Sequence, residues 1–163
     1  MLKAELLFGS NMVLQRDKPV AIWGTATPGA RIAVRMQEKV AIATTDPCGN
    51  WNALCGPYSL SFDEQMEIDD GEEHLCFTNV QVGEVYLAGG QSNMEFHMRY
   101  DQDYAAEKEI CKNPNIRFFD YPEVSYLGQL NERNYLKHYG FWRVAEPEQL
   151  ERFSAVSYYF AKD

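Results

Sequence analysis

The stretch Val82-Gly83-Glu84-Val85-Tyr86-Leu87-Ala88 is a mostly apolar run of strand length, and Gly89-Gly90-Gln91-Ser92-Asn93 follows it directly. A continuous apolar run is typical of a strand that is buried on both faces, as in a parallel sheet. Residues 103–112 have a helical pattern, and a second strand is predicted at 116–120. Strand, glycine turn, helix and strand make a βαβ unit, so this region predicts an α/β sheet.

The chain before this stretch has a different pattern. Short runs rich in Val, Ile and aromatic residues predict strands at 12–14, 20–23, 31–36, 40–45 and 58–62. Turn residues such as Thr27-Pro28-Gly29 separate them. Strands at this spacing predict a small antiparallel β-sandwich. The acidic stretch 63–73 is interpreted as a solvated turn and hairpin edge, because its carboxylates lack the ligand spacing of a calcium loop.

We therefore predict a mixed fold with two domains. Residues 1–80 form the antiparallel β-sandwich, and residues 81–163 form the first part of an α/β domain. An amphipathic helix over 147–162 should lead into a further strand, but the sequence ends at Asp163. Since an open parallel sheet needs several strands with helices on both faces, we expect the chain to stop within this domain.

Composition narrows the function. The 163 residues include 15 Lys and Arg against 24 Asp and Glu, a net charge of −9, which argues against nucleic acid or an anionic membrane as partner. Without a basic leader or a long apolar run, the chain as given is expected to be cytoplasmic, or secreted or periplasmic if its N-terminus is processed. The four cysteines lack zinc-site spacing, so we expect reduced thiols and no metal.

Ser92 is the candidate catalytic residue. A sharp turn between strand and helix would lift its Oγ clear of the backbone, and its N–H could stabilise an oxyanion. The alternative is that Ser92 only caps a helix, which serine does well. The Gly-Gly-x-Ser pattern alone favours this alternative, and it is not the Gly-x-Ser-x-Gly motif of α/β-hydrolases.

The wider context resembles a known family. Residues 83–95 resemble the first sequence block of the SGNH hydrolases, in their sialate O-acetylesterase-like branch. Further blocks of that branch are matched, in order, by Asn11-Met12-Val13-Leu14-Gln15-Arg16, Ile22-Trp23-Gly24, Pro28-Gly29, Gly49-Asn50-Trp51, Gly56-Pro57-Tyr58, Trp142, Pro147 and residues 153–161. The resemblance runs from about residue 6 to residue 162 and implies a jelly-roll-like β domain before a flavodoxin-like three-layer α/β domain.

The resemblance also implies a chemistry. The chain would belong to a carbohydrate O-acetylesterase that acts on an acetylated sugar without a cofactor, with Ser92 as nucleophile and its N–H as one oxyanion donor. The family's other oxyanion donors (a glycine and an asparagine) and its Asp and His partners have no counterpart here. Serine without a base is a poor nucleophile. We therefore expect a truncated enzyme whose base comes from outside the chain.

Local side chains offer weaker alternatives. His97, His74 and His138 are each interpreted as surface or packing residues rather than bases. Glu84 is expected to be a hydrogen-bonding residue at the strand end, and Glu95 a first-turn carboxylate. An aromatic set could line a sugar site, although core packing is the simpler interpretation: Phe118, Phe119, Tyr121, Tyr126, Tyr135, Tyr139, Phe141 and Trp142.

Two other functions stay open at this point. The chain could be a non-catalytic β-sandwich module that binds a carbohydrate or a protein, with a vestigial half of a hydrolase domain. Its uncovered sheet edge would then pair with another chain and give a homo-oligomer or a complex. Alternatively, the missing C-terminal half could be a separate polypeptide whose association rebuilds the catalytic triad.

Overall fold

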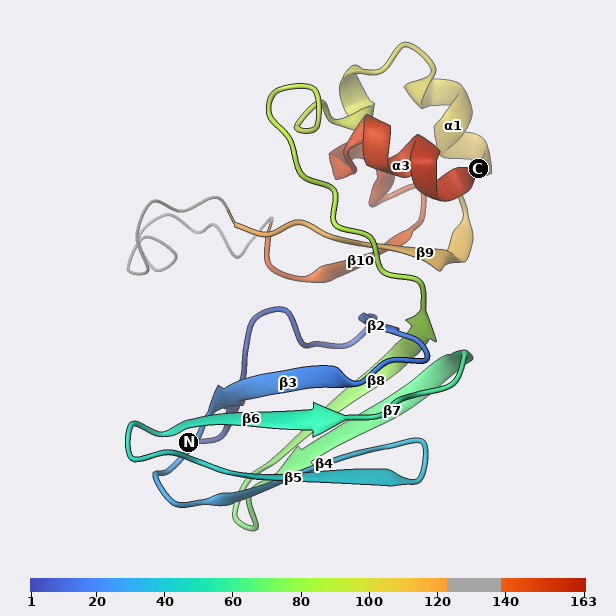
Figure 1. Ribbon diagram of the computed structural model, residues 1–163. Coiled ribbons are helices and arrows are strands. Elements are labelled where there is room, and N and C mark those ends of the chain that lie inside the picture. The colour runs from blue at the N-terminus through green and yellow to red at the C-terminus, as the bar shows by residue number, and fades with distance from the viewer. Residues whose placement is uncertain (123–138) are drawn as a thin grey trace. The chain divides into compact units, whose positions relative to one another are not determined.

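The structure is a computed structural model in which residues 1–122 and 139–163 are described (Figure 1). Contacts divide the chain into two compact units. The first contains residues 1–85 and 119–141, and the second contains residues 86–118 and 142–163. The predicted domain boundary near residue 80 stays a prediction. No helix of the described residues is long and apolar enough to cross a bilayer.

The first unit is built from two sheets. The three-stranded sheet is antiparallel and has the order β1 (Lys3–Ala4), β3 (Val20–Thr25) and β6 (Asn50–Cys55). The five-stranded sheet has the order β2 (Val13–Gln15), β8 (His74–Gly83), β7 (Ser61–Asp69), β4 (Arg31–Met36) and β5 (Lys39–Thr44). This second sheet is mixed, because β2 runs parallel to β8 while the other pairs are antiparallel.

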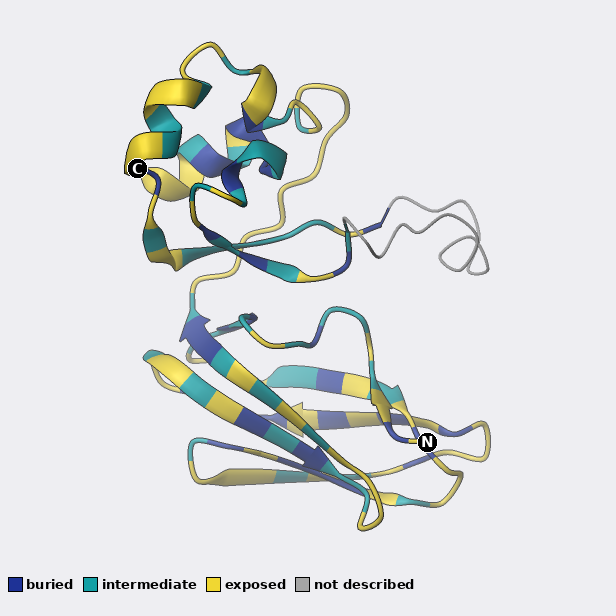
Figure 2. Cartoon of the chain, turned by 180° about the vertical axis from the view of Figure 1, so that it is seen from behind, coloured by how far each residue is buried: buried dark blue, intermediate teal, exposed yellow. Residues whose placement is uncertain are grey.

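Alternating side chains build the core of the first unit. In β6, Trp51, Ala53 and Cys55 are buried, while Asn50, Asn52 and Leu54 are exposed. This is the period of two that a strand with one covered face requires. Figure 2 shows buried and exposed residues within the other strands as well, although β4 and β8 each contain three consecutive buried residues. Buried apolar residues of the five-stranded sheet include Leu14, Ile32, Val34, Met36, Met66, Ile68, Val80 and Val82. Each full burial of such a side chain contributes roughly 1.5–3 kcal/mol.

The second unit is smaller and mixed. It contains η1 (Met98–Tyr100), α1 (Tyr104–Ile110), β9 (Asn113–Phe119, except its last residue), β10 (Trp142–Ala145), η3 (Leu150–Arg152) and α3 (Ala155–Lys162). β9 pairs with β10 in a two-stranded sheet. The core of this unit consists of Met98, Cys111, Ala145, Leu150, Phe153, Ala155 and Tyr158. Ser154 caps α3, because its Oγ accepts a hydrogen bond from the N–H of Ser157.

The fold-class prediction is wrong. β8 ends at Gly83, and residues 84–88 have exposed, irregular backbone instead of forming a strand buried on both faces. Leu87 is 99% exposed. Among the described residues no strand lies beside this run, so its peptide groups form no ladder and its residues stay exposed. The described chain is rich in β-structure and shows no three-layer α/β arrangement, and the antiparallel sheet predicted for the N-terminal region is in part a mixed one.

Several element boundaries also differ from the predictions. β7 starts only at Ser61 and then continues through most of the acidic stretch, to Asp69. The strands β6 and β8 were not predicted. The helix predicted at 147–162 is divided into η3 and α3, because the buried Phe153 between them has extended backbone, with φ −65° and ψ 144°. The helix predicted at 103–112 matches α1.

Candidate active site

Ser92 lies in an exposed turn of the second unit. The N–H groups of Met94 and Glu95 both donate to the carbonyl oxygen of Gln91, at 2.8 and 3.1 Å, and so close the turn around Ser92. The turn follows irregular backbone and not a parallel strand, so the strand part of the predicted elbow is absent here. The serine nevertheless presents its side chain to solvent.

The backbone of the turn leaves two donors available. Within residues 1–122 and 139–163, neither the N–H of Ser92 nor that of Asn93 donates a hydrogen bond. The same part of the chain supplies no partner for Ser92 Oγ. Unpaired N–H groups beside an exposed hydroxyl are the arrangement that can stabilise negative charge on a bound carbonyl oxygen.

The turn is anchored to the start of α3. The N–H of Met98 donates to the carbonyl oxygen of Phe153 at 2.8 Å, and the N–H of Ala155 donates to that of Phe96, also at 2.8 Å. These bonds form a short antiparallel bridge between His97 and Ser154. The backbone that follows Ser92 therefore has a fixed position within its own unit.

His97 is the nearest candidate base in the sequence. Its ring is half-buried and stacks on Tyr100, with the ring centroids 6.3 Å apart. Burial lowers the pKa of His97, and the positive charges of Arg99 and Arg152 lower it further. The imidazole is therefore neutral at pH 7 and able to accept a proton. No hydrogen bond joins it to Ser92 among the described residues, so the structure does not bring the two together.

The remaining candidate residues lie elsewhere. His74, in β8 of the first unit, has its Nε2 3.9 Å from a carboxylate oxygen of Glu67. Glu84 accepts hydrogen bonds from Gln15 Nε2 at 3.0 Å and from Arg16 Nε at 2.7 Å, and both bonds lower the pKa of its carboxyl group. Three further candidates, His138, Tyr126 and Tyr135, lie outside the described residues.

The described aromatic residues do not form one cluster around Ser92. Phe118 stacks on the buried Phe153, with ring centroids 4.7 Å apart, and belongs to the core of the second unit. Phe119 instead lies beside Tyr121, with the two ring centroids 6.2 Å apart. Tyr86 packs edge-to-face against Phe160 of α3, at 5.0 Å, close in sequence to the serine turn. The last contact was not expected from the sequence.

Cysteines and acidic residues form no site in the described chain. All four cysteines are free thiols, with Cys55 and Cys111 buried and Cys48 and Cys76 exposed. The described residues contain no group of three or more His, Cys, Asp or Glu side chains that could hold a metal ion. The expectation of a cofactor-free reaction stays a prediction.

Comparison with known proteins adds one finding. No protein-family model and no curated protein matches this sequence. A solved structure from Xanthomonas citri matches with a TM-score of 0.84 and 29% sequence identity over 98% of this chain. That protein is a carbohydrate acetylesterase. This chain spans 36% of the acetylesterase's length. The similarity to the acetylesterase supports a hydrolase-like fold for this chain.

Two serines of the C-terminal block contact the turn in a way that the sequence pattern did not predict. Ser154 and Ser157 lie in the block that resembles the family, yet nothing in the pattern assigned them a role. In the structure both hydroxyls donate to the sulfur of Met94. The three-residue spacing of Ser154 and Ser157 could have indicated this contact. At the start of a helix it predicts that the first serine caps the helix and that the second lies on the same face.

Proposed function

We propose that this chain is part of a carbohydrate O-acetylesterase in which Ser92 is the nucleophile. The structural similarity to the Xanthomonas citri acetylesterase over 98% of the chain carries this proposal. The exposed hydroxyl of Ser92 and the adjacent free N–H groups support it further. The motifs at residues 83–95 support the narrower assignment to the SGNH hydrolases of the sialate O-acetylesterase type.

The proposed reaction is acyl transfer. Ser92 Oγ attacks the acetyl carbonyl carbon while a histidine accepts its proton, and the N–H of Ser92 stabilises the oxyanion. The histidine then donates that proton to the sugar oxygen, which leaves as a hydroxyl group. Water hydrolyses the acetyl-serine, releases acetate and restores Ser92.

We propose that the Asp and His partners come from a segment outside this chain. The described residues bring no histidine to Ser92 Oγ, and the chain corresponds to 36% of the acetylesterase. The same reasoning applies to the oxyanion donors that have no counterpart in this sequence. The proposed substrate class is an acetylated sugar, because the similar protein from Xanthomonas citri is a carbohydrate acetylesterase.

The proposal is tested in a chimeric protein that can supply the Asp and His partners and the other oxyanion donors. Residues 1–163 replace the matching segment of the Xanthomonas citri acetylesterase, and hydrolysis of p-nitrophenyl acetate is measured for the folded chimera and for the isolated chain. Ser92→Ala should lower the rate of the chimera by at least about 10³-fold. Ser59→Ala is the matched control, because Ser59 is exposed in the first unit.

Three outcomes are informative. Loss of activity in the Ser92→Ala chimera alone supports the proposal. Equal rates for a folded chimera and its Ser92→Ala variant contradict the role of Ser92. Activity of the isolated chain that depends on Ser92 contradicts the proposed external base and directs attention to His97.

A further inference from the structure

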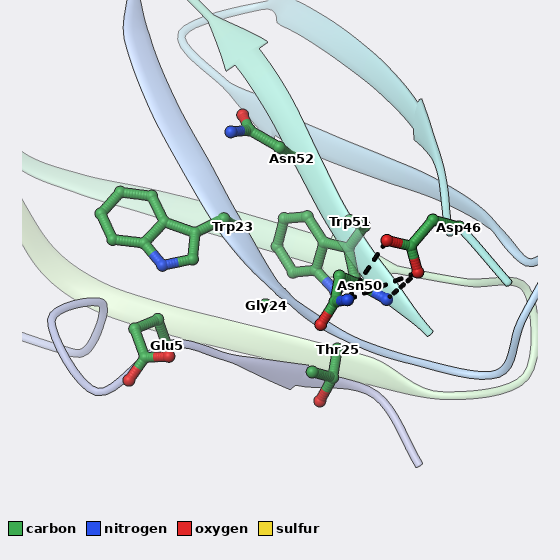
Figure 3. Close-up of a pocket in the computed structure, with 8 residues that line it drawn as sticks. All are labelled: Glu5, Trp23, Gly24, Thr25, Asp46, Asn50, Trp51 and Asn52. Atoms are coloured by element: carbon green, nitrogen blue, oxygen red, sulfur yellow. Dashed lines mark hydrogen bonds between the residues drawn. The ribbon is translucent and has the colours of Figure 1, made fainter. Parts of the chain in front are cut away.

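The outer face of the three-stranded sheet carries a polar and aromatic hollow far from Ser92 in the sequence. In the β3–β6 register Trp23 lies opposite Asn52, and Thr25 lies opposite Asn50, with all four side chains exposed. Cross-strand partners share one face of a sheet. These four residues line an open hollow of about 400 Å³ together with Glu5, Asp46, Gly24 and Trp51 (Figure 3), and Glu5 and Asp46 contribute its two carboxylates. We call the four cross-strand side chains and the two carboxylates the Trp23 surface.

The backbone around Gly24 holds Glu5 beside Trp23. A Cβ atom on Gly24 would lie 2.0 Å from the carbonyl oxygen of Lys3, so only glycine allows β1 to approach this closely. The N–H of Glu5 then donates to the carbonyl oxygen of Trp23 at 3.0 Å. The sequence Trp-Gly in β3 thus places a carboxylate next to an indole ring.

The indole ring is both oriented and accessible. The ring of the buried Phe8 packs perpendicular to that of Trp23, with centroids 4.8 Å apart. Trp23 still has 37% of its surface exposed. A fixed and partly exposed aromatic face binds the apolar C–H faces of a sugar ring without the entropy cost of ordering a flexible side chain.

The polar groups of the hollow are held in place as well. Asp46 Oδ1 accepts the N–H groups of Cys48 and Asn50, at 2.8 and 2.9 Å. Asn50 Nδ2 donates to Asp46 Oδ2 at 3.2 Å, as Figure 3 shows. The hydrogen bonds from Asn50, followed by those from the turn, lower the pKa of Asp46. Asp46 is therefore an ionised acceptor, and Asn50 keeps its amide oxygen directed to solvent.

We propose that the Trp23 surface binds neutral pyranose units of a glycan chain. An indole face with amide, hydroxyl and carboxylate groups around it matches a ring that has apolar faces and equatorial hydroxyls. The lining residues include two carboxylates and no basic side chain among the described residues, so an acidic sugar is disfavoured. This inference goes beyond the proposed esterase function, because it assigns glycan binding to a surface that takes no part in the acyl transfer.

Binding is tested with the full 163-residue chain by following tryptophan fluorescence and, independently, ligand-observed NMR. The neutral probes are cellohexaose, xylohexaose and mannohexaose, and hexagalacturonate is the anionic probe. At least one neutral probe should bind with Kd on the order of 1 mM or lower, a weak affinity typical of one aromatic platform. Hexagalacturonate should bind at least about tenfold more weakly.

Two variants test whether residues of the Trp23 surface bind the glycan. Trp23→Ala and Asn52→Ala should each weaken binding about tenfold. Asn52→Ala changes an exposed polar side chain, so it retains the fold if the loss of the Phe8 contact unfolds Trp23→Ala. Ile42→Ala is the control, because Ile42 is an exposed apolar residue of β5 in the other sheet.

The outcomes separate this inference from the esterase proposal. No binding of any neutral probe, preferred binding of hexagalacturonate, or unchanged binding by folded Asn52→Ala overturns the inference. Ser92→Ala should bind the neutral probe with unchanged affinity. A chain that binds sugar but shows no Ser92-dependent hydrolysis in the chimera would leave glycan binding established and contradict only the esterase proposal.

Discussion

The sulfur of Met94 lies 3.2 Å from Ser157 Oγ, and the serine hydroxyl donates a hydrogen bond to it. Ser154 Oγ donates to the same sulfur at 3.4 Å. Both serines belong to the start of α3, and Met94 follows Ser92 by two residues. The thioether therefore ties the turn of the candidate nucleophile to a helix that is adjacent to it only in the folded chain. We therefore expect Met94 to hold the turn that contains Ser92 in position.

Replacing Met94 should loosen the serine turn. Met94→Ala removes the half-buried side chain and both sulfur contacts, so we expect a loss of about 1–2 kcal/mol in the free energy of unfolding. Met94→Leu keeps most of the volume and should lose less than half of that. Hydrogen exchange should become faster at the amides of residues 94 and 95 in Met94→Ala, because their hydrogen bonds to the Gln91 carbonyl oxygen would open more often without the contacts to α3. Unchanged exchange at these residues in a folded Met94→Ala protein would exclude the positioning role.

His97 should make stability depend on pH. Its pKa is lowered in the folded protein from 6.5, so between the folded value and 6.5 the unfolded chain binds more protons. The stability is therefore full above pH 6.5 and falls as the pH drops through 6.5 toward the folded pKa. Denaturant unfolding at about pH 7.5 and about pH 5 should show a smaller difference for His97→Gln than for the unchanged protein. His74→Gln, on an exposed strand residue, is the control and should keep the full difference.

Glu107 should link α1 to α3. Its carboxylate accepts hydrogen bonds from Lys162 Nζ at 2.7 Å and from Tyr158 Oη at 2.9 Å. Tyr158 is buried, so Glu107→Ala leaves its hydroxyl without this acceptor and should cost about 1–3 kcal/mol. Thermal unfolding measures the effect, and Glu109→Ala, an exposed position on the same helix, should have little effect.

Acid should weaken the same link. The hydrogen bond from Lys162 is the main cause that lowers the pKa of Glu107 below 4.5. The resulting stabilisation is present above pH 4.5 and is lost as the pH falls through the folded pKa. Glu107→Ala should therefore reduce the loss of stability on acidification below pH 4.5. Equal acid sensitivity in both proteins would argue against the link.

Gly24 should tolerate no side chain. Gly24→Ala places a Cβ atom 2.0 Å from the Lys3 carbonyl oxygen, a backbone atom that can move only with β1. We expect a loss of about 1–3 kcal/mol in the free energy of unfolding, measured by denaturant titration. Gly9→Ala is the matched control, since nothing lies within 4 Å of the position of its Cβ atom. Similar stability of the two variants would show that β1 does not approach β3 this closely in solution.

Much of the β-structure could be predicted from local patterns. The runs at 20–23, 31–36 and 40–45 lie within or overlap β3, β4 and β5, because alternating Val, Ile and Ala residues favour half-buried strands. β6 was not predicted, although buried and exposed residues alternate throughout Asn50-Trp51-Asn52-Ala53-Leu54-Cys55. Residues 46–50 have the composition of a turn, and this turn prediction includes the first residue of β6. β8 was not predicted because its first half alternates exposed residues (His74, Cys76 and Thr78) with only partly buried ones, and the polar Asn79 follows Leu75 and Phe77 in the partly buried series.

The candidate site was predictable only in part. The motif around Ser92 indicated an exposed serine in a turn, and the structure has one. The preceding apolar run predicted a buried strand, yet residues 84–88 are exposed. A run of apolar residues indicates that a segment can be buried, but a β-strand also needs a second strand that forms hydrogen bonds with its backbone. That second strand is not among the described residues.

The sequence by itself determined the acidic charge and the alternation that makes the first unit a β-structure. It also supplied the motif that singles out Ser92. Only the tertiary structure placed Trp23 opposite Asn52 and Met94 against Ser157. The physical reason is that such contacts depend on strand register and helix docking between segments distant in sequence. In the strand pair, a register shift of one residue would turn Trp23 to the other face of the sheet.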